Sequence, residues 1–160
     1  MSGIFLVVEA EGTSPDTSFL RPTKGGYPHI TFVYTGKSME LARLNGTAIL
    51  LLVHLVAGTD ELATYTLDAA HAHVNSFRVG STGEMRHDVL LGLSATDAGR
   101  IEHMRDTFLP ADKRAEFSTN PPHVTHSIHD NKEDAEKALA DLRSQNVFPV
   151  RVRITGVTVD

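Results

Sequence analysis

The sequence predicts a single α+β domain, and three observations support this fold class. The chain has 160 residues, which is about the length of one ordinary domain. Apolar residues make up 41% and charged residues 22%, a balance close to that of globular proteins and unlike that of disordered chains or fibres. Apolar β-branched runs alternate with segments of helical periodicity along the whole chain.

The expected elements follow one another without a linker or a low-complexity tract. Apolar and β-branched runs predict strands at 4–10, 29–34, 89–94, 123–129 and 150–159, with one or two more at 63–77. Apolar residues three and four positions apart predict helices at 38–56, 96–109 and 131–145. The last helix has acidic residues early and basic residues late, which suits the helix dipole.

The segment 38–56 admits two interpretations. Ser38 is a candidate N-cap and Gly58 a candidate stop, but Asn45 and Gly46 interrupt the helical pattern. The alternative is a short helix followed by a strand at 49–56. The stretch 12–26 is rich in Thr, Ser, Pro and Gly and predicts a long loop, and long loops often carry function.

Composition excludes several classes of function. The 15 Lys and Arg against 20 Asp and Glu give a net charge of −5, which argues against stable, nonspecific binding of duplex nucleic acid. The sequence has no cysteine, so it can form neither disulfides nor thiolate metal sites. The longest apolar stretch, 48–57, is too short to cross a membrane, and the run at 4–8 is too short for a signal peptide. We therefore expect a cytoplasmic protein that does not bind membranes.

A four-residue pattern that occurs twice is the strongest functional signal. PHIT at 28–31 opens one expected strand, and PHVT at 122–125 opens another. With nine histidines in the chain, about one His-x-Thr match is expected by chance, but only about 0.005 copies of the longer pattern. Two copies therefore point to a shared role.

Strand geometry gives this pattern a chemical meaning. Side chains alternate between the two faces of a strand, so His29 and Thr31 share one face. In the second copy the shared face is expected to hold His123, Thr125, Ser127 and His129. Two such strands facing each other would gather two imidazoles and two hydroxyls around one cleft. One imidazole can accept a proton while the other donates one, and the hydroxyls can hold phosphate oxygens, so no metal is needed for phosphodiester hydrolysis.

At these residues the sequence resembles the 2H phosphoesterase superfamily, which is named for two His-x-[Thr/Ser] motifs on pseudo-symmetric lobes. The resemblance covers most of the chain. It implies that residues 1–160 form one domain of two lobes, with a motif in each lobe at 29–31 and 123–125. It also implies two antiparallel sheets that face a central cleft, with the helices outside.

The resemblance also implies roles for the motif residues. By analogy, His29 and His123 are the acid–base pair, Thr31 and Thr125 hold the phosphate, and no metal or other cofactor takes part. One position departs from the family pattern, because His126 stands where the family has an apolar residue. Its side chain is expected to point away from the cleft, so the departure concerns packing of that lobe.

The implied function is metal-independent hydrolysis of a nucleotide phosphodiester. The substrate would be a small nucleotide or a short oligonucleotide: a 2′,3′-cyclic phosphate, as at an RNA end, or a cyclic or 2′,5′-linked oligonucleotide. Three alternatives stay open. They are a phage-type enzyme that degrades cyclic oligonucleotide immune signals, a catalytically inactive nucleotide-binding module of the same fold, and a histidine-rich metal hydrolase. The sequence indicates neither the oligomeric state nor which histidine is the acid.

Residues near the motifs are additional candidates for substrate binding. Lys24 and Tyr27 precede the first motif and could bring a charge and a base-stacking ring to the cleft mouth. Ser127, together with His129, could lie at the cleft edge.

The other histidines are weaker candidates. His71 and His73 are two positions apart, a spacing that could serve a metal, although a polar sheet face is the simpler expectation. His54 and His103 are expected to be ordinary helix-surface residues.

Overall fold

The computed structural model describes residues 3–10, 28–35, 40–57, 64–109 and 121–159, and these ranges confirm the α+β class. The first half contains β1 (Gly3–Ala10), β2 (His29–Tyr34), α1 (Leu41–Ala57) and β3 (Thr64–Arg78). The second half contains β4 (Met85–Leu93), α3 (Ala95–Phe108), β5 (His123–His129), α4 (Lys132–Ser144) and β6 (Val150–Val159). Every described element matches a predicted one, with ends that differ by a few residues.

The helix α1 is continuous, so the alternative of a strand at 49–56 is wrong. Its buried stripe consists of Leu44, Ala48, Leu51 and Leu55, which recur three and four positions apart. Gly46 lies on the exposed side with open space around it, so it weakens the helix without disturbing the packing. The proposed N-cap at position 38, the stop at position 58 and the loop at 12–26 lie outside the described residues.

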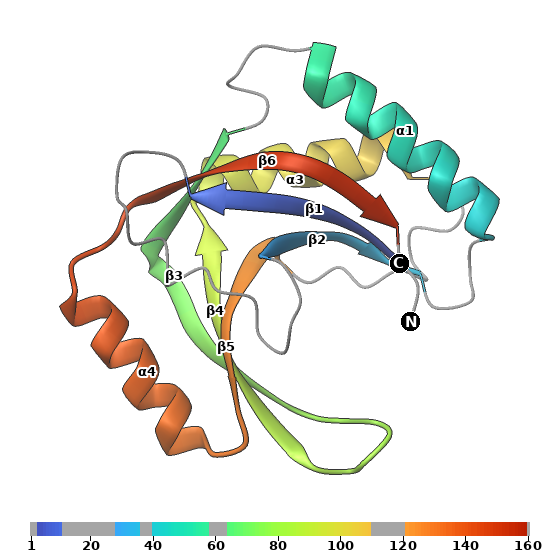
Figure 1. The fold of residues 1–160 in the computed structure, drawn as a ribbon. Coiled ribbons are helices and arrows are strands. Elements are labelled where there is room, and N and C mark those ends of the chain that lie inside the picture. The colour runs from blue at the N-terminus through green and yellow to red at the C-terminus, as the bar shows by residue number, and fades with distance from the viewer. Residues whose placement is uncertain (1–2, 11–27, 36–39, 58–63, 110–120, 160) are drawn as a thin grey trace.

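The six strands form one closed sheet in the order β1-β2-β5-β4-β3-β6, with antiparallel neighbours throughout. The expectation of two separate sheets is therefore wrong. The reason is β3, which has 15 residues and pairs with β6 through its first part and with β4 through its remainder. On the opposite side β2 and β5 join at a single residue pair, Ile30 and Val124, and then diverge. Figure 1 shows β1, β2 and β6 running together, while β4 and β5 run away from them.

The core lies between one face of this sheet and the helices. Alternate strand residues point into it and are almost completely buried: Ile4, Leu6, Ile30, Val124, Leu91 and Val152. The helix α4 packs on β3, β4 and β5, whereas α1 packs mainly on β6. The residues between these core positions lie on the opposite face of the sheet. We call it the motif face, because the motif residues belong to it or border it, with the exception of Ile30 and Val124.

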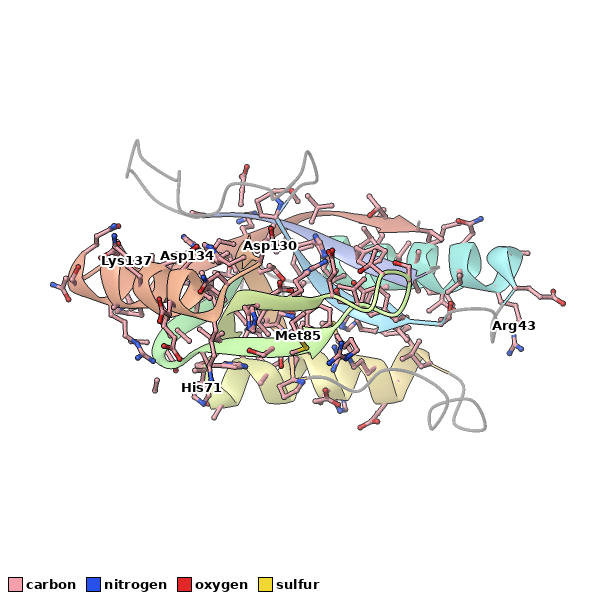
Figure 2. All side chains as sticks on the ribbon, turned by 90° about the horizontal axis from the view of Figure 1, so that it is seen from below. Arg43, His71, Met85, Asp130, Asp134 and Lys137 are labelled. Carbon is pink, nitrogen blue, oxygen red and sulfur yellow. The ribbon has the colours of Figure 1, made fainter. Side chains whose placement is uncertain are left out.

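The helix α4 illustrates how closely local sequence determines an element here. Asn131 caps it by accepting a hydrogen bond from the backbone N–H of Glu133 at 2.7 Å. Figure 2 shows Asp134 and Lys137 projecting outward from this helix. Among the residues that the structure describes, no helix is long and apolar enough to cross a membrane.

Candidate active site

The two motif strands meet at the seam where the sheet closes. Ile30 pairs with Val124, and both side chains are 0% exposed in the core. Because neighbouring positions alternate, the residues on either side of each, His29 and Thr31 in β2 and His123 and Thr125 in β5, lie on the motif face. The structure thus brings the two His/Thr pairs to the same face of the sheet and to the same level along the strands.

The strand β1 supports the first motif. Val7 is the cross-strand partner of His29, and Phe5 is the partner of Thr31. The Phe5 ring meets the His29 imidazole edge to face, with ring centroids 5.2 Å apart and planes at 82°. Phe5 itself is only 7% exposed, so the imidazole is held against a fixed apolar wall.

The second motif fixes the tautomer of its histidine. His123 Nδ1 lies 2.8 Å from the carbonyl oxygen of Pro121, which can only accept a hydrogen bond. Nδ1 therefore carries the proton, and Nε2 of the neutral ring is a proton acceptor. Burial lowers the pKa of His123, the Pro121 carbonyl opposes that shift, and His73, Arg105 and His29 lower the pKa further. The neutral form is thus favoured near pH 7, as a general base requires.

A buried arginine that the sequence analysis did not single out supports the first motif from behind. Arg105 of α3 is 4% exposed and donates from Nε to the Phe32 carbonyl at 2.8 Å and from Nη2 to the Thr31 carbonyl at 2.9 Å. A further hydrogen bond joins its Nη1 to Glu102. Phe32 is an additional residue in the register between β1 and β2, so the guanidinium holds the backbone where the ladder is irregular.

A signal for Arg105 does exist in the sequence. It lies next to Met104 and in the same helical stripe as Ile101 and Phe108, so a charged residue occupies a position facing the core. A charged side chain at such a position needs hydrogen-bond partners, and here the partners are backbone carbonyls of the first motif.

A pocket of about 220 Å³ opens beside His123 on the motif face. His73 pairs with Leu90, and Leu90 pairs with Thr125, so the pocket lies on the side of β5 that faces away from β2. Its walls come from His71, His73 and Asn75 of β3, Leu90 of β4, and His123 with the two prolines before it. His71 and His73 therefore line one pocket together, and the described residues contain no cluster of three or more His, Asp or Glu suited to a metal.

A bulge corrects one part of the sequence-based site. Thr125 is the partner of Leu90, but Ser127 is the partner of Val89, so β5 has one additional residue, His126, at this point. The bulge turns Ser127 onto the face that carries the core residue Val89. The expectation that Ser127 lies on the face of His123 and Thr125 is therefore wrong.

His129 lies on the same face as Ser127, opposite to the motif face, and pairs with His87. There the Ser127 Oγ lies 2.8 Å from His129 Nε2 and 3.1 Å from His126 Nδ1. His126 is thus accommodated beside a hydroxyl, and burial followed by the nearby His129 lowers its pKa.

Four further residues have roles predicted from the sequence, two as substrate-binding candidates and two as helix-surface histidines. Lys24 and Tyr27 lie outside the described residues. His54 and His103 are exposed on α1 and α3, as expected for helix-surface residues.

Comparison with known proteins adds the fold relationship. No family model and no curated protein sequence matches the chain. The structure of Usb1 from Kluyveromyces marxianus with uridine monophosphate aligns with a TM-score of 0.53 and 10% identity over 99% of this chain and 97% of that chain. Usb1 is a member of the 2H phosphoesterase family. The chain shares its overall fold with Usb1. A second structure of Usb1 aligns with a TM-score of 0.49 and 12% identity over 99% and 96% of the two chains.

In this Usb1-like fold, the seam between β2 and β5 holds residues of the kinds that acid–base chemistry needs. Two histidines and two hydroxyls lie on one face, and Nδ1 of His123 donates its proton in a hydrogen bond to a backbone carbonyl. A pocket adjoins His123. The arrangement can transfer protons on both sides of a bound phosphate.

Proposed function

We propose that the protein is a metal-independent phosphodiesterase that hydrolyses a nucleotide phosphodiester with His29 and His123 as its acid–base pair. The observation that carries the proposal is the placement of both His/Thr pairs on the motif face at the seam. The full-length likeness to Usb1 supports a phosphoesterase fold, and the uridine monophosphate in that structure supports a nucleotide as ligand.

In the proposed reaction His123 is the base and His29 is the acid. His123 Nε2 takes the proton from the nucleophile, which is water or a ribose hydroxyl, as the new P–O bond forms. His29 gives a proton to the leaving oxygen as the old P–O bond breaks. The Thr31 and Thr125 hydroxyls donate hydrogen bonds to the nonbridging oxygens. The lowered pKa of His123 and its Nδ1 bond to Pro121 support this assignment of roles.

The test is a substrate panel followed by mass spectrometry in excess EDTA. The panel contains 2′,3′-cyclic nucleotides, 2′,5′-linked oligonucleotides and cyclic oligonucleotides. We expect hydrolysis of at least one class by the wild type and none by the double variant His29→Ala/His123→Ala. Activity that disappears in EDTA would instead indicate a metal hydrolase, and nucleotide binding without turnover would indicate an inactive binding module.

The pH profile of kcat/KM is expected to be bell-shaped, with an acidic limb below pH 6.5. The base must be neutral to act, and burial lowers the pKa of His123 below the ordinary value of about 6.5, so activity persists to lower pH than for an exposed histidine. Because the two histidines interact, the pKa values read from both limbs of the profile belong to the pair and not to either histidine alone. Rates measured from about pH 5 to 9 in EDTA check this, and a rate that climbs steadily to the alkaline end contradicts it.

Each threonine is expected to contribute less than a histidine. Thr31→Val and Thr125→Val remove one hydrogen bond each from the phosphate while keeping the side-chain shape, so kcat/KM should fall about 10-fold per site. Thr107→Val is the matched control, because Thr107 is exposed on α3 and its hydroxyl donates to the His103 carbonyl within its own helix. Wild-type kinetics in both motif variants would show that these hydroxyls do not touch the phosphate.

A further inference from the structure

We propose that the pocket beside His123 is a nucleobase subsite formed by His71, His73 and Asn75. It would hold the base of the nucleoside on the His123 side of the scissile phosphate. The inference rests on the proposed function, because it assigns part of the substrate to a pocket that shares a wall with the proposed base.

The position of His71 depends on two features of the sheet. Between Leu67 and Ala72 the strand β3 has more residues than β4, and this bulge lays His71 over Gly92. A Cβ on Gly92 would lie 2.6 Å from the His71 carbonyl oxygen and 2.7 Å from its Cβ, so only glycine allows this approach. Gly92 is also the cross-strand partner of His123, which ties the pocket wall to the second motif.

Hydrogen bonds orient both imidazoles of the pocket. His71 Nδ1 lies 2.6 Å from the Asp68 carboxylate, and His73 Nδ1 lies 3.1 Å from the His71 carbonyl. Both partners accept, so each Nδ1 carries a proton and each Nε2 is the ring nitrogen available to a ligand. The His71 side chain, labelled in Figure 2, is 47% exposed, so a ligand can reach it.

The chemistry of the lining favours a base over a phosphate. No Lys or Arg lines the pocket among the described residues, whereas a phosphate is usually held by such cations. Leu90, Pro121 and Pro122 supply apolar surface instead. Unpaired bases are recognised by stacking on aromatic rings, including imidazole, and by hydrogen bonds to their edges, which the Asn75 amide can make as both donor and acceptor.

The size of the pocket agrees with this ligand. Its volume of about 220 Å³ is below the several hundred cubic ångströms of sites for drug-sized ligands, so it suits one flat heterocycle better than a larger fragment. The wall shared with His123 places such a ring next to the reacting phosphate.

The experiment compares dinucleotides that carry a base on both sides of the linkage with analogues that are abasic on one side. In the wild type, loss of the base on the pocket side should lower kcat/KM roughly 5- to 150-fold. The variants His73→Ala and Asn75→Ala should lose most of this preference, mainly through KM on the complete substrate. Asn75→Ala should cleave the abasic substrate at the wild-type rate. His103→Ala, an exposed histidine on α3, should keep the full preference.

Equal cleavage of complete and abasic substrates by the wild type would overturn the subsite while leaving the hydrolase intact, as would an unchanged preference in His73→Ala and Asn75→Ala. Absence of hydrolysis for every linkage would overturn the proposed function instead. Binding is then tested without turnover by titrating the protein with adenosine or uridine. Shifts of the His71 and His73 imidazole NMR signals are expected, and their absence at millimolar nucleoside would overturn the subsite.

Discussion

Replacing His123 by alanine is expected to lower kcat/KM by about 10²- to 10⁴-fold, the usual contribution of a general base. The free energy of unfolding should change by about 1 kcal/mol or less, because the side chain lies on the motif face and, among the described residues, the substitution removes one hydrogen bond, to the Pro121 carbonyl. Steady-state kinetics and urea denaturation of the same preparation measure both. His103→Ala, on the exposed side of α3, controls for the loss of a histidine.

The leaving group separates the two catalytic roles. A p-nitrophenyl ester of a nucleotide needs no proton on departure, so His29→Ala should regain most of its activity on that substrate. His123→Ala should stay impaired, because its defect lies in activating the nucleophile. Recovery of His123→Ala with the activated ester would reverse the assignment of acid and base. Near-wild-type activity of His123→Ala on natural linkages would remove it from the mechanism altogether.

Local patterns in the sequence predict most of the fold. Alternation in β2 is enough to place His29 and Thr31 opposite the buried Ile30, and helical periodicity in α1 prevails over the Asn45-Gly46 interruption. The strand and the helix both depend on residues a few positions apart, and the spacing of apolar residues in the sequence reveals such local patterns.

The features that the sequence does not reveal depend on register between distant strands. A bulge at His126 places Ser127 on the opposite face of the sheet from the one that strand alternation predicts. No pattern within β5 reveals this bulge, because a residue is additional only in the pairing of β5 with β4. The closed sheet likewise depends on where β3 leaves β6 for β4. The pocket beside His123 combines such a register shift with the close approach at Gly92.

Arg105 is expected to have the largest effect on stability among single substitutions at the site. Arg105→Met keeps much of the aliphatic bulk but leaves the carbonyls of Thr31 and Phe32 without their buried donors. Hydrogen bonds to charged groups contribute about 1.5–3 kcal/mol each and two are lost, so we expect the free energy of unfolding to fall by about 3–6 kcal/mol. The free energy of unfolding of Arg105→Lys should lie between those of the wild type and Arg105→Met, because an ammonium group lacks the planar fork that reaches two acceptors. Arg43→Met, at an exposed position of α1, should change stability by less than about 0.5 kcal/mol.

Activity distinguishes support of the motif by Arg105 from a purely structural role. The arginine is one of the groups that lower the pKa of His123, after burial and His73. Its removal therefore raises that pKa, and the acidic limb of kcat/KM should move to higher pH in Arg105→Met but stay in place in Arg105→Lys, which keeps the charge. Both variants are measured at a temperature where they are fully folded. An unchanged limb in Arg105→Met, with stability reduced as expected, would mean that Arg105 holds the backbone of β2 without acting on the second histidine.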